Sequence, residues 1–425
     1  MLKRFLSGIN IELELLKCVR GLTPRSLRSY QVRRRLSRLI MEQKASSQRS
    51  EHPGTRRMYV DIAVIQSHDA GTGIQRVVRA IALQLITELP PHWELHFVTA
   101  TKKIPYQTVA WPKSQGDFSS VKMVASPGDV FIGLDFSLDA IRRHQSQLYQ
   151  FKANGGKLWF LVHDLLAVQR PDWFSDNTVL RYKAWLDIIA STADGFLCNS
   201  TQTANELIDE FSNRYQLHAG FSTAVIPMGS GIMDTVIAKD EASTLEGGRF
   251  SSLPSYCLMV GTLEPRKGHA DIISAFSELW KNGSVECLVL IGRLGWKVDD
   301  LKLMIEAHVE YGKKLFWFND VSDGELYCAY EQAQGVIIGS LAEGFGLPLT
   351  EALGLGRPVL ARDITVFRYH ESNGVSYFPK TATSPELALA IGAWINEVRQ
   401  GRICVKKPTL SWEDAARALI ATVSG

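Results

Sequence analysis

Residues 335–351 read GVIIGSLAEGFGLPLTE, and this stretch is the clearest indication of the fold in its part of the chain. It begins with a short apolar segment, Gly335–Ile338, which suits a buried strand, and ends in an apolar-rich segment with Pro348 near its start. Proline suits the first turn of a helix, because it lacks an amide proton that no helical carbonyl would accept there. The stretch therefore predicts a strand, a glycine-containing loop and a helix through Leu353.

The loop in this stretch combines two glycines with two acidic residues. Gly344 and Gly346 allow the backbone to approach a ligand, and the amides of the loop and of the helix start favour an anion such as a diphosphate. Glu343 and Glu351 can accept hydrogen bonds from vicinal hydroxyls, which both a sugar and a ribose offer. The run predicts a sugar-nucleotide site. The alternative is a plain helix start in which the acidic residues only complement the helix dipole.

Short apolar runs alternate with helical stretches along the chain, a pattern typical of parallel sheets covered by helices. The strands expected in a first domain are Met58–Ile65, Leu95–Val98, Asp129–Leu134, Leu158–Val162, Gly195–Cys198 and Val225–Ile226. Those of a second domain are Tyr256–Val260, Cys287–Ile291, Leu315–Phe318, Val336–Ile338 and Pro358–Ala361. A chain of 425 residues, 45% of them hydrophobic, suits two such cores. The expected fold class is α/β, with two Rossmann-like domains.

A second motif, GTLEPRKG at 261–268, directly follows the expected strand Tyr256–Val260. It places Arg266 and Lys267 side by side on a loop at the carboxyl edge of the sheet, where two cations can neutralise a leaving diphosphate. The alternative is a solvated basic turn.

The motifs at 261–268, 319–326 (NDVSDGEL) and 343–351 together resemble the family 4 retaining glycosyltransferases, and are similar to bacterial polysaccharide and O-antigen mannosyl- or rhamnosyltransferases. The resemblance covers the second domain. It implies a GT-B fold, in which two Rossmann-like domains have parallel sheets facing across a cleft, a nucleoside-diphosphate sugar as donor, and no obligatory metal. Two departures are Gly339, where the family often has proline, and Tyr369-His370-Glu371, where Glu-Val is common.

The resemblance also implies roles for single residues. Arg266 and Lys267 would bind the diphosphate, Glu351 the ribose, and Glu343 would lie near the sugar, so that Arg266, Lys267 and Glu343 count as catalytic candidates. The remaining donor-binding candidates in this domain are Gly261, Val321, Gly344, Phe345, Gly346 and Leu347.

In the first domain the resemblance is looser and rests on DAGTGIQR at 69–76. Gly71, Thr72 and Gly73 are donor-binding candidates, because the glycines permit a tight turn whose amides approach the donor. Read as G-x-G-x-x-G, the run fails at Arg76, so dinucleotide binding is not indicated. A plain strand-to-helix turn is the alternative.

His163 ends the expected strand Leu158–Val162, and in the resembling family a histidine there faces the donor sugar, which makes it the fourth catalytic candidate. Asp164 and Ser200 are candidates on the acceptor side. The alternatives are a structural histidine and, for Ser200, an ordinary helix N-cap.

Four parts are expected along the chain: a partly helical basic arm at 1–55, an acceptor domain at 56–235, a donor domain at 250–405, and a helix at 406–425 that packs back towards the first domain. Residues 1–50 hold 12 Lys/Arg and 3 Glu, a balance of +9, whereas the rest of the chain holds 35 basic and 41 acidic residues, a balance of −6. Apolar residues recur at helical spacing from Leu2 to Val19 among these charges. The arm therefore predicts an amphipathic helix on an anionic membrane surface or, equally, one that packs on the protein itself. Nucleic acid is not an expected partner.

Composition narrows the chemistry further. The six cysteines form no C-x-x-C pair, no signal peptide or apolar run of membrane-spanning length is found, and no Asp-x-Asp is present. We expect a cytoplasmic protein, peripheral at the inner face of the cytoplasmic membrane, without cofactor or metal.

The expected activity is retaining, metal-independent sugar transfer. The donor is a nucleotide sugar, with GDP-mannose as the leading guess, and the acceptor is a growing surface polysaccharide or a lipid-linked glycan. The alternatives are a sugar-nucleotide epimerase on the same fold and a catalytically silent nucleotide-sugar-binding partner.

Overall fold

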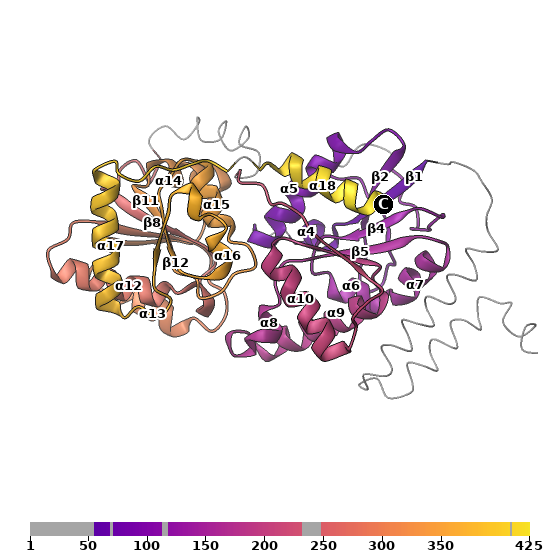
Figure 1. The fold of residues 1–425 in the computed structure, drawn as a ribbon, viewed down its shortest axis with the longest axis horizontal. Coiled ribbons are helices and arrows are strands. Elements are labelled where there is room, and N and C mark those ends of the chain that lie inside the picture. The colour runs from indigo at the N-terminus through magenta and orange to yellow at the C-terminus, as the bar shows by residue number, and fades with distance from the viewer. Residues whose placement is uncertain (1–54, 69–70, 113–117, 232–247, 409) are drawn as a thin grey trace, which may run out of the picture. The chain divides into compact units, whose positions relative to one another are not determined.

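The computed structural model describes residues 55–68, 71–112, 118–231, 248–408 and 410–425 (Figure 1). The chain divides into two compact units. Unit 1 comprises the described residues up to Leu165 together with Leu180–Ile226 and Ala416–Gly425, and unit 2 comprises Leu166–Val179 and Pro227–Ala415. The predicted basic arm at 1–55 lies outside the described residues except for Thr55.

Unit 1 is built on a seven-stranded sheet in the order β3-β2-β1-β4-β5-β6-β7. Neighbouring strands run parallel except for the antiparallel pair β2 and β3. The strands are β1 (Arg56–Asp61), β2 (Trp93–Thr99), β3 (Gln107–Thr108), β4 (Val130–Gly133), β5 (Lys157–Val162), β6 (Gly195–Cys198) and β7 (Ser222–Val225). The helices that lie wholly in unit 1 are α4 (Ala63–Ser67), α5 (Gly73–Glu88), α6 (Leu138–Arg143), α7 (Gln145–Ala153) and α10 (Thr201–Tyr215).

Two helices cross the boundary between the ranges of the units, α9 (Asp176–Thr192) and α18 (Trp412–Ser424). The end of α18 is held within unit 1, since Arg417 pairs with Glu88 at 2.6 Å and the backbone oxygen of Ser424 accepts a hydrogen bond from Arg56. The sequence predicts a continuous first domain at 56–235, but the segment Leu166–Val179 clusters with unit 2.

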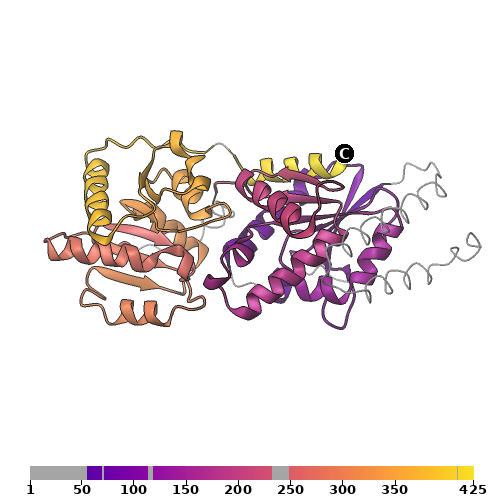
Figure 2. The same cartoon turned by 60° about the horizontal axis from the view of Figure 1, so that its bottom comes forward.

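Unit 2 has a six-stranded, all-parallel sheet in the order β10-β9-β8-β11-β12-β13. The strands are β8 (Tyr256–Val260), β9 (Cys287–Ile291), β10 (Leu315–Phe318), β11 (Gly335–Ile338), β12 (Val359–Arg362) and β13 (Val375–Phe378). The helices are α8 (Leu166–Gln169), α12 (His269–Lys281), α13 (Asp299–Glu306), α14 (Asp323–Gln332), α15 (Leu347–Gly354), α16 (Thr365–Arg368) and α17 (Ser384–Arg399). Figure 2 shows the sheet of this unit between its helices.

Apolar residues fill both faces of the unit 2 sheet. Tyr256 and Leu258 of β8 pack in one cluster with residues of α14 and α15, whereas the alternate residues Cys257 and Met259 pack in a second cluster with α12 and α17. Successive side chains of a strand point to opposite faces, so a continuous apolar run such as Tyr256–Val260 is what a doubly covered strand requires. The predicted α/β class with two Rossmann-like domains is confirmed.

Most strand predictions agree with the structure to within a few residues, and three elements differ. The first strand was predicted to reach Ile65 but ends at Asp61, because the Asp61 carboxylate accepts a hydrogen bond from the amide of Ala63 at 2.9 Å and the chain turns into α4. The edge strands β3 and β13 were not predicted. No helix within the described residues is long and apolar enough to span a membrane.

Candidate active site

The basic pair lies on a turn between β8 and α12. Pro265, Arg266 and Lys267 form a single 3-10 turn, and Gly268 follows in the left-handed region with φ 71°. Because β8 pairs with β11 in the parallel sheet, the loops that follow these two strands meet at the same edge. The backbone joins them directly, since the amide of Leu341 donates to the carbonyl of Arg266 at 2.7 Å.

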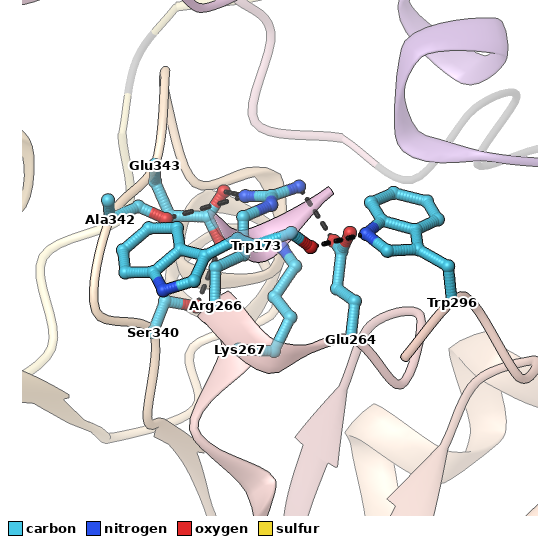
Figure 3. Close-up of polar contacts among 8 residues, drawn as sticks. All are labelled: Trp173, Glu264, Arg266, Lys267, Trp296, Ser340, Ala342 and Glu343. Atoms are coloured by element: carbon cyan, nitrogen blue, oxygen red, sulfur yellow. Dashed lines mark hydrogen bonds and ion pairs between the residues drawn. The ribbon is translucent and has the colours of Figure 1, made fainter. Parts of the chain in front are cut away.

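Four charged side chains from these two loops form one cluster (Figure 3). Arg266 contacts Glu343 Oε2 at 2.6 Å and Glu264 Oε1 at 2.8 Å, so its guanidinium bridges two carboxylates. Lys267 Nζ contacts Glu343 Oε1 at 2.5 Å, and Ser340 Oγ donates to the same oxygen at 2.7 Å. Two cations and two anions are therefore held in mutual contact at the carboxyl end of the sheet.

The cluster keeps Glu343 ionised. Burial alone would raise the pKa of this carboxyl, but the charges of Lys267 and Arg266, with hydrogen bonds from Lys267 and Ser340, outweigh it and lower the pKa to about 2. Glu343 is 8% exposed. An ionised carboxylate can accept hydrogen bonds or balance positive charge, but it has no proton to donate.

The predicted helix after the Glu343 loop is α15, and it starts as expected with proline in its first turn. Gly346 is the residue before the helix, with φ 98°, and a Cβ there would lie 2.5 Å from the ring of Phe367. Glycine is therefore required at this position both by backbone conformation and by space. Pro348 has no amide proton, and the amide of Leu349 donates to the carbonyl of Gly346 at 3.0 Å, so the backbone amides that suit an anion at this helix start are those of residues 345–347.

Glu351 lies in the body of α15 and is 2% exposed. Its Oε2 accepts a hydrogen bond from the Tyr330 hydroxyl of α14 at 2.9 Å.

The other predicted donor residues lie around the same loops. The ring of Phe345 meets that of His370 edge-on, with 6.5 Å between the ring centres, and Val321 packs against the apolar cluster that contains Tyr330. The amide of Gly261 donates to Ile291, and a Cβ at Gly261 would lie 3.5 Å from Lys267 Cε. Gly344 is buried beside Glu343.

Aromatic residues adjoin the Arg266 loop through the loop after β9. The amide of Leu263 donates to the carbonyl of Arg293, and the amide of Gly295 donates to the carbonyl of Leu263, each at 2.9 Å. These two backbone hydrogen bonds join the loop after β8 to the loop after β9. The next residue, Trp296, donates its indole proton to the carbonyl of Trp173 at 2.7 Å (Figure 3). Sequence reasoning did not find Trp296, since nothing local connects it with residue 173.

In unit 1 the predicted glycine-rich loop ends in a capped helix. Thr72 is the N-cap of α5 and forms a capping box with Gln75. Gln75 also donates to the carbonyl of His68 at 2.7 Å. Gly71 has φ 65° and Gly73 is the first residue of the helix. Asp69 and Ala70 lie outside the described residues. The expected strand Met58–Ile65 would lead almost directly into this loop, whereas in the structure α4 lies between β1 and the loop.

His163 follows β5, and its Nε2 lies 2.9 Å from the carbonyl of Leu134 at the end of β4. Burial lowers the pKa of His163, which favours the neutral ring. The backbone oxygen of the next residue, Asp164, accepts a hydrogen bond from the Tyr182 hydroxyl. Ser200 is the N-cap of α10 and accepts a hydrogen bond from the amide of Thr203 at 3.1 Å.

Three further polar residues at the strand ends of unit 1 were not among the predicted site residues. Asp61 is buried at the end of β1 and accepts hydrogen bonds from Ser137 at 2.5 Å and Tyr106 at 2.9 Å. Asp135 follows β4, and burial together with the charge of Asp61 raises its pKa to about 6. Asn199 follows β6 and donates to the carbonyl of His163 at 2.7 Å.

Asp135 and Asn199 present unused acceptors at this edge. Within the described residues, the buried Oδ2 of Asp135 and the buried Oδ1 of Asn199 have no hydrogen-bond partner. Both residues directly follow an apolar segment expected as a buried strand, and this position in the sequence could have identified them as site candidates. In unit 2 the structure thus brings together Arg266, Lys267 and Glu343. In unit 1 it places Asp135, His163 and Asn199 after the neighbouring strands β4, β5 and β6.

Comparison with known proteins adds to this geometry. Residues 248–407 match the family described as glycosyl transferases group 1. The chain is 34% identical over 80% of its length to the serotype-specific mannosyltransferase WbdA of Escherichia coli, and covers 41% of that protein. It therefore spans less than half the length of this relative.

Solved structures share the fold. A sucrose-phosphate synthase from Thermosynechococcus elongatus has a TM-score of 0.57 at 17% identity, over 87% of this chain and 96% of that one. WaaG, a glycosyltransferase involved in lipopolysaccharide biosynthesis, has a TM-score of 0.50 at 14% identity, over 86% and 95% of the two chains. At these identities the likeness is one of fold alone.

Proposed function

Because residues 248–407 form a domain of the group 1 glycosyl transferases and the chain is homologous to WbdA, we propose that this protein transfers a sugar from a nucleoside-diphosphate donor to a glycan. The observation that carries the proposal is the joining of Arg266, Lys267 and Glu343 beside the start of α15. Two cations and a helix N-terminus suit a diphosphate, and the buried carboxylate next to them suits the hydroxyls of a sugar.

The two cations are the electrophilic part of the proposed mechanism. As the glycosidic bond to the diphosphate breaks, negative charge grows on the leaving group, and donors already held at that point lower the barrier by several kcal/mol. Glu264 and Glu343 hold Arg266 in place before the donor arrives. We propose that this pair and the backbone amides of residues 345–347 take the part that a divalent metal plays in other transferases, and that the anomeric configuration is retained.

The proposed donor is GDP-mannose and the proposed acceptor is a growing surface polysaccharide or a lipid-linked glycan. Support for mannose comes from the name of the relative WbdA, a mannosyltransferase. Glu351 remains the candidate for the ribose and His163 for the donor sugar, with Asp164 and Ser200 on the acceptor side. Neither cofactor nor nucleic acid has a part in the proposal.

We also propose that the protein works in the cytoplasm and that residues 1–50 attach it to the inner face of the cytoplasmic membrane. Their balance of +9 supports this, because each basic side chain near an anionic surface contributes about 1 kcal/mol.

The function is tested by incubating the purified protein with GDP-mannose and a mannose-terminated oligosaccharide, with and without EDTA. We expect GDP and an oligosaccharide longer by one mannose, at a rate that EDTA leaves unchanged. GDP-glucose and UDP-glucose serve as control donors. An epimerase would instead convert the donor without acceptor, and a silent partner would bind the donor without turnover. Activity lost on chelation and restored by manganese would contradict the metal-free mechanism.

A further inference from the structure

Arg362 is a buried charged residue of unit 2 that lies outside the ion-pair cluster of Glu264, Arg266, Lys267 and Glu343. It is the last residue of β12, is 2% exposed, and is the largest of the fully buried side chains in the described part of the chain. Its guanidinium lies 5.0 Å from the centre of the Phe378 ring. Burial of an arginine is costly unless its donors are satisfied, so its partners show what it holds together.

The three partners belong to three different segments. Nε donates to the carbonyl of Gly339 at 2.8 Å, Nη1 to the carbonyl of Lys380 at 2.8 Å, and Nη2 to Asp271 Oδ2 at 2.6 Å. Gly339 begins the loop that carries Ser340 and Glu343, whereas Asp271 lies in the first turn of α12, four residues after Lys267. Arg362 therefore bonds to the loop that carries Glu343 and to the first turn of the helix that follows the loop of Arg266 and Lys267.

The two loops meet at a contact that leaves no spare room. A Cβ on Gly268 would lie 2.2 Å from the carbonyl oxygen of Gly339, the same oxygen that accepts the bond from Arg362. A Cβ on Gly339 would lie 3.1 Å from the carbonyl oxygens of both Lys267 and Gly268. Glycine at 339, where the resembling family often has proline, thus permits this close approach. A shift of either loop would be passed directly to Lys267 and Glu343.

We propose that Arg362 is a positioning residue that sets the placement of Arg266 and Lys267 against Glu343. It acts through its hydrogen bonds to the Gly339 carbonyl and the Asp271 carboxylate. The inference rests on the proposed function for its catalytic consequence, but its structural consequence, a rigid junction between the two loops, can be measured without turnover.

Stability alone is a poor reason for this arrangement. The side chain of Asp271 is half exposed, and a buried ion pair contributes little net stability because desolvation offsets the attraction between the charges. What a planar guanidinium adds over an apolar residue is direction, since its donors are fixed in one plane and reach three acceptors at once.

The test compares Arg362→Lys with the matched control Arg357→Lys. Arg357 also donates to two backbone carbonyls of unit 2, those of Leu355 and Ala333, but bonds to neither loop. Two measurements are made on each folded variant: amide hydrogen exchange at Leu341, whose amide joins the loops by its bond to Arg266, and steady-state kinetics with GDP-mannose.

For Arg362→Lys we expect faster exchange at Leu341 and a fall in kcat of about 100-fold, with the acceptor KM within about twofold, since small displacements of catalytic groups cost this much. Arg357→Lys should change neither. Asp271→Ala removes one partner from a half-exposed site, and should shift both readings in the same direction by less. It serves as the second variant if Arg362→Lys does not fold.

Unchanged exchange at Leu341 and unchanged kcat in a folded Arg362→Lys or Asp271→Ala variant would overturn the proposal. So would a loss of activity that follows the unfolded fraction alone, because that is what a purely structural residue would give. If the wild type transfers sugar from no nucleotide sugar, the proposed function fails. Exchange at Leu341 then still decides whether Arg362 holds the two loops together.

Discussion

At the scale of the residue, the chemistry depends on pairs that hold each other in place. Glu343 has a pKa of about 2 because Lys267 and Arg266 outweigh its burial. The same contacts fix both cations before a ligand arrives, which is the condition for electrostatic catalysis. The contribution of Lys267 to turnover can therefore be tested by replacing this residue alone.

Lys267→Met removes the charge but keeps most of the side-chain volume. We expect turnover to fall roughly a hundredfold or more, because one of two cations at the leaving diphosphate is lost. The control is Lys281→Met, which removes an exposed lysine of α12 paired with Glu278 at 2.8 Å. Equal turnover of the two variants, measured as mannose transferred by folded protein, would contradict the assignment of Lys267 to the diphosphate.

At the scale of the element, α12 begins with a buried titratable group. His269 is the first residue of this helix and is 1% exposed, and within the described residues neither ring nitrogen has a hydrogen-bond partner. Burial, and secondarily the charge of Lys267, lowers its pKa to about 3. The native state thus holds a neutral ring over a pH range in which the unfolded chain holds a protonated one.

The sign of the pH dependence follows. A depressed native pKa gives stability that is complete above the unfolded value of about 6.5 and is lost as the pH falls towards 3, at about 1.4 kcal/mol per pH unit. His269→Leu removes this pH-dependent loss of stability. The free energy of unfolding of the variant minus that of the wild type should therefore be larger at pH 5.5 than at pH 7.5. Urea unfolding at both pH values measures it, with surface variant His218→Gln as control. An advantage that does not change with pH would show that His269 titrates normally.

At the scale of the whole molecule, charge is divided unevenly along the chain. Residues 1–50 carry +9 and the remaining residues −6. A chain with this division can bind an anionic surface through one segment while the rest is weakly repelled.

Deleting residues 1–50 should release the protein from vesicles of anionic lipid while leaving transfer to a soluble acceptor largely intact. High salt should have the same effect by screening. Replacing Arg33, Arg34, Arg35 and Arg38 with glutamine is the matched variant that keeps the apolar pattern, and it should weaken vesicle sedimentation in the same way. A truncated protein that melts early or aggregates would show instead that the arm packs on the protein itself.

The fold class, most of the strands and the ends of the key loops could be predicted from local sequence patterns. Runs such as Tyr256–Val260 and Gly335–Ile338 are apolar throughout because both faces are covered, and that requirement is local enough to be read directly. Pro348 and Gly346 likewise marked the start of α15 through their own backbone preferences.

The contacts between charged groups, in contrast, could not be predicted from local patterns. Lys267 and Glu343 are 76 residues apart and Arg362 and Asp271 are 91 apart, so no local pattern connects them. The edge strand β13, the end of β1 at Asp61 and the burial of His269 also depend on neighbours distant in the chain. The physical reason is that backbone preferences act over a few residues, whereas ion pairing and burial depend on what the fold brings alongside.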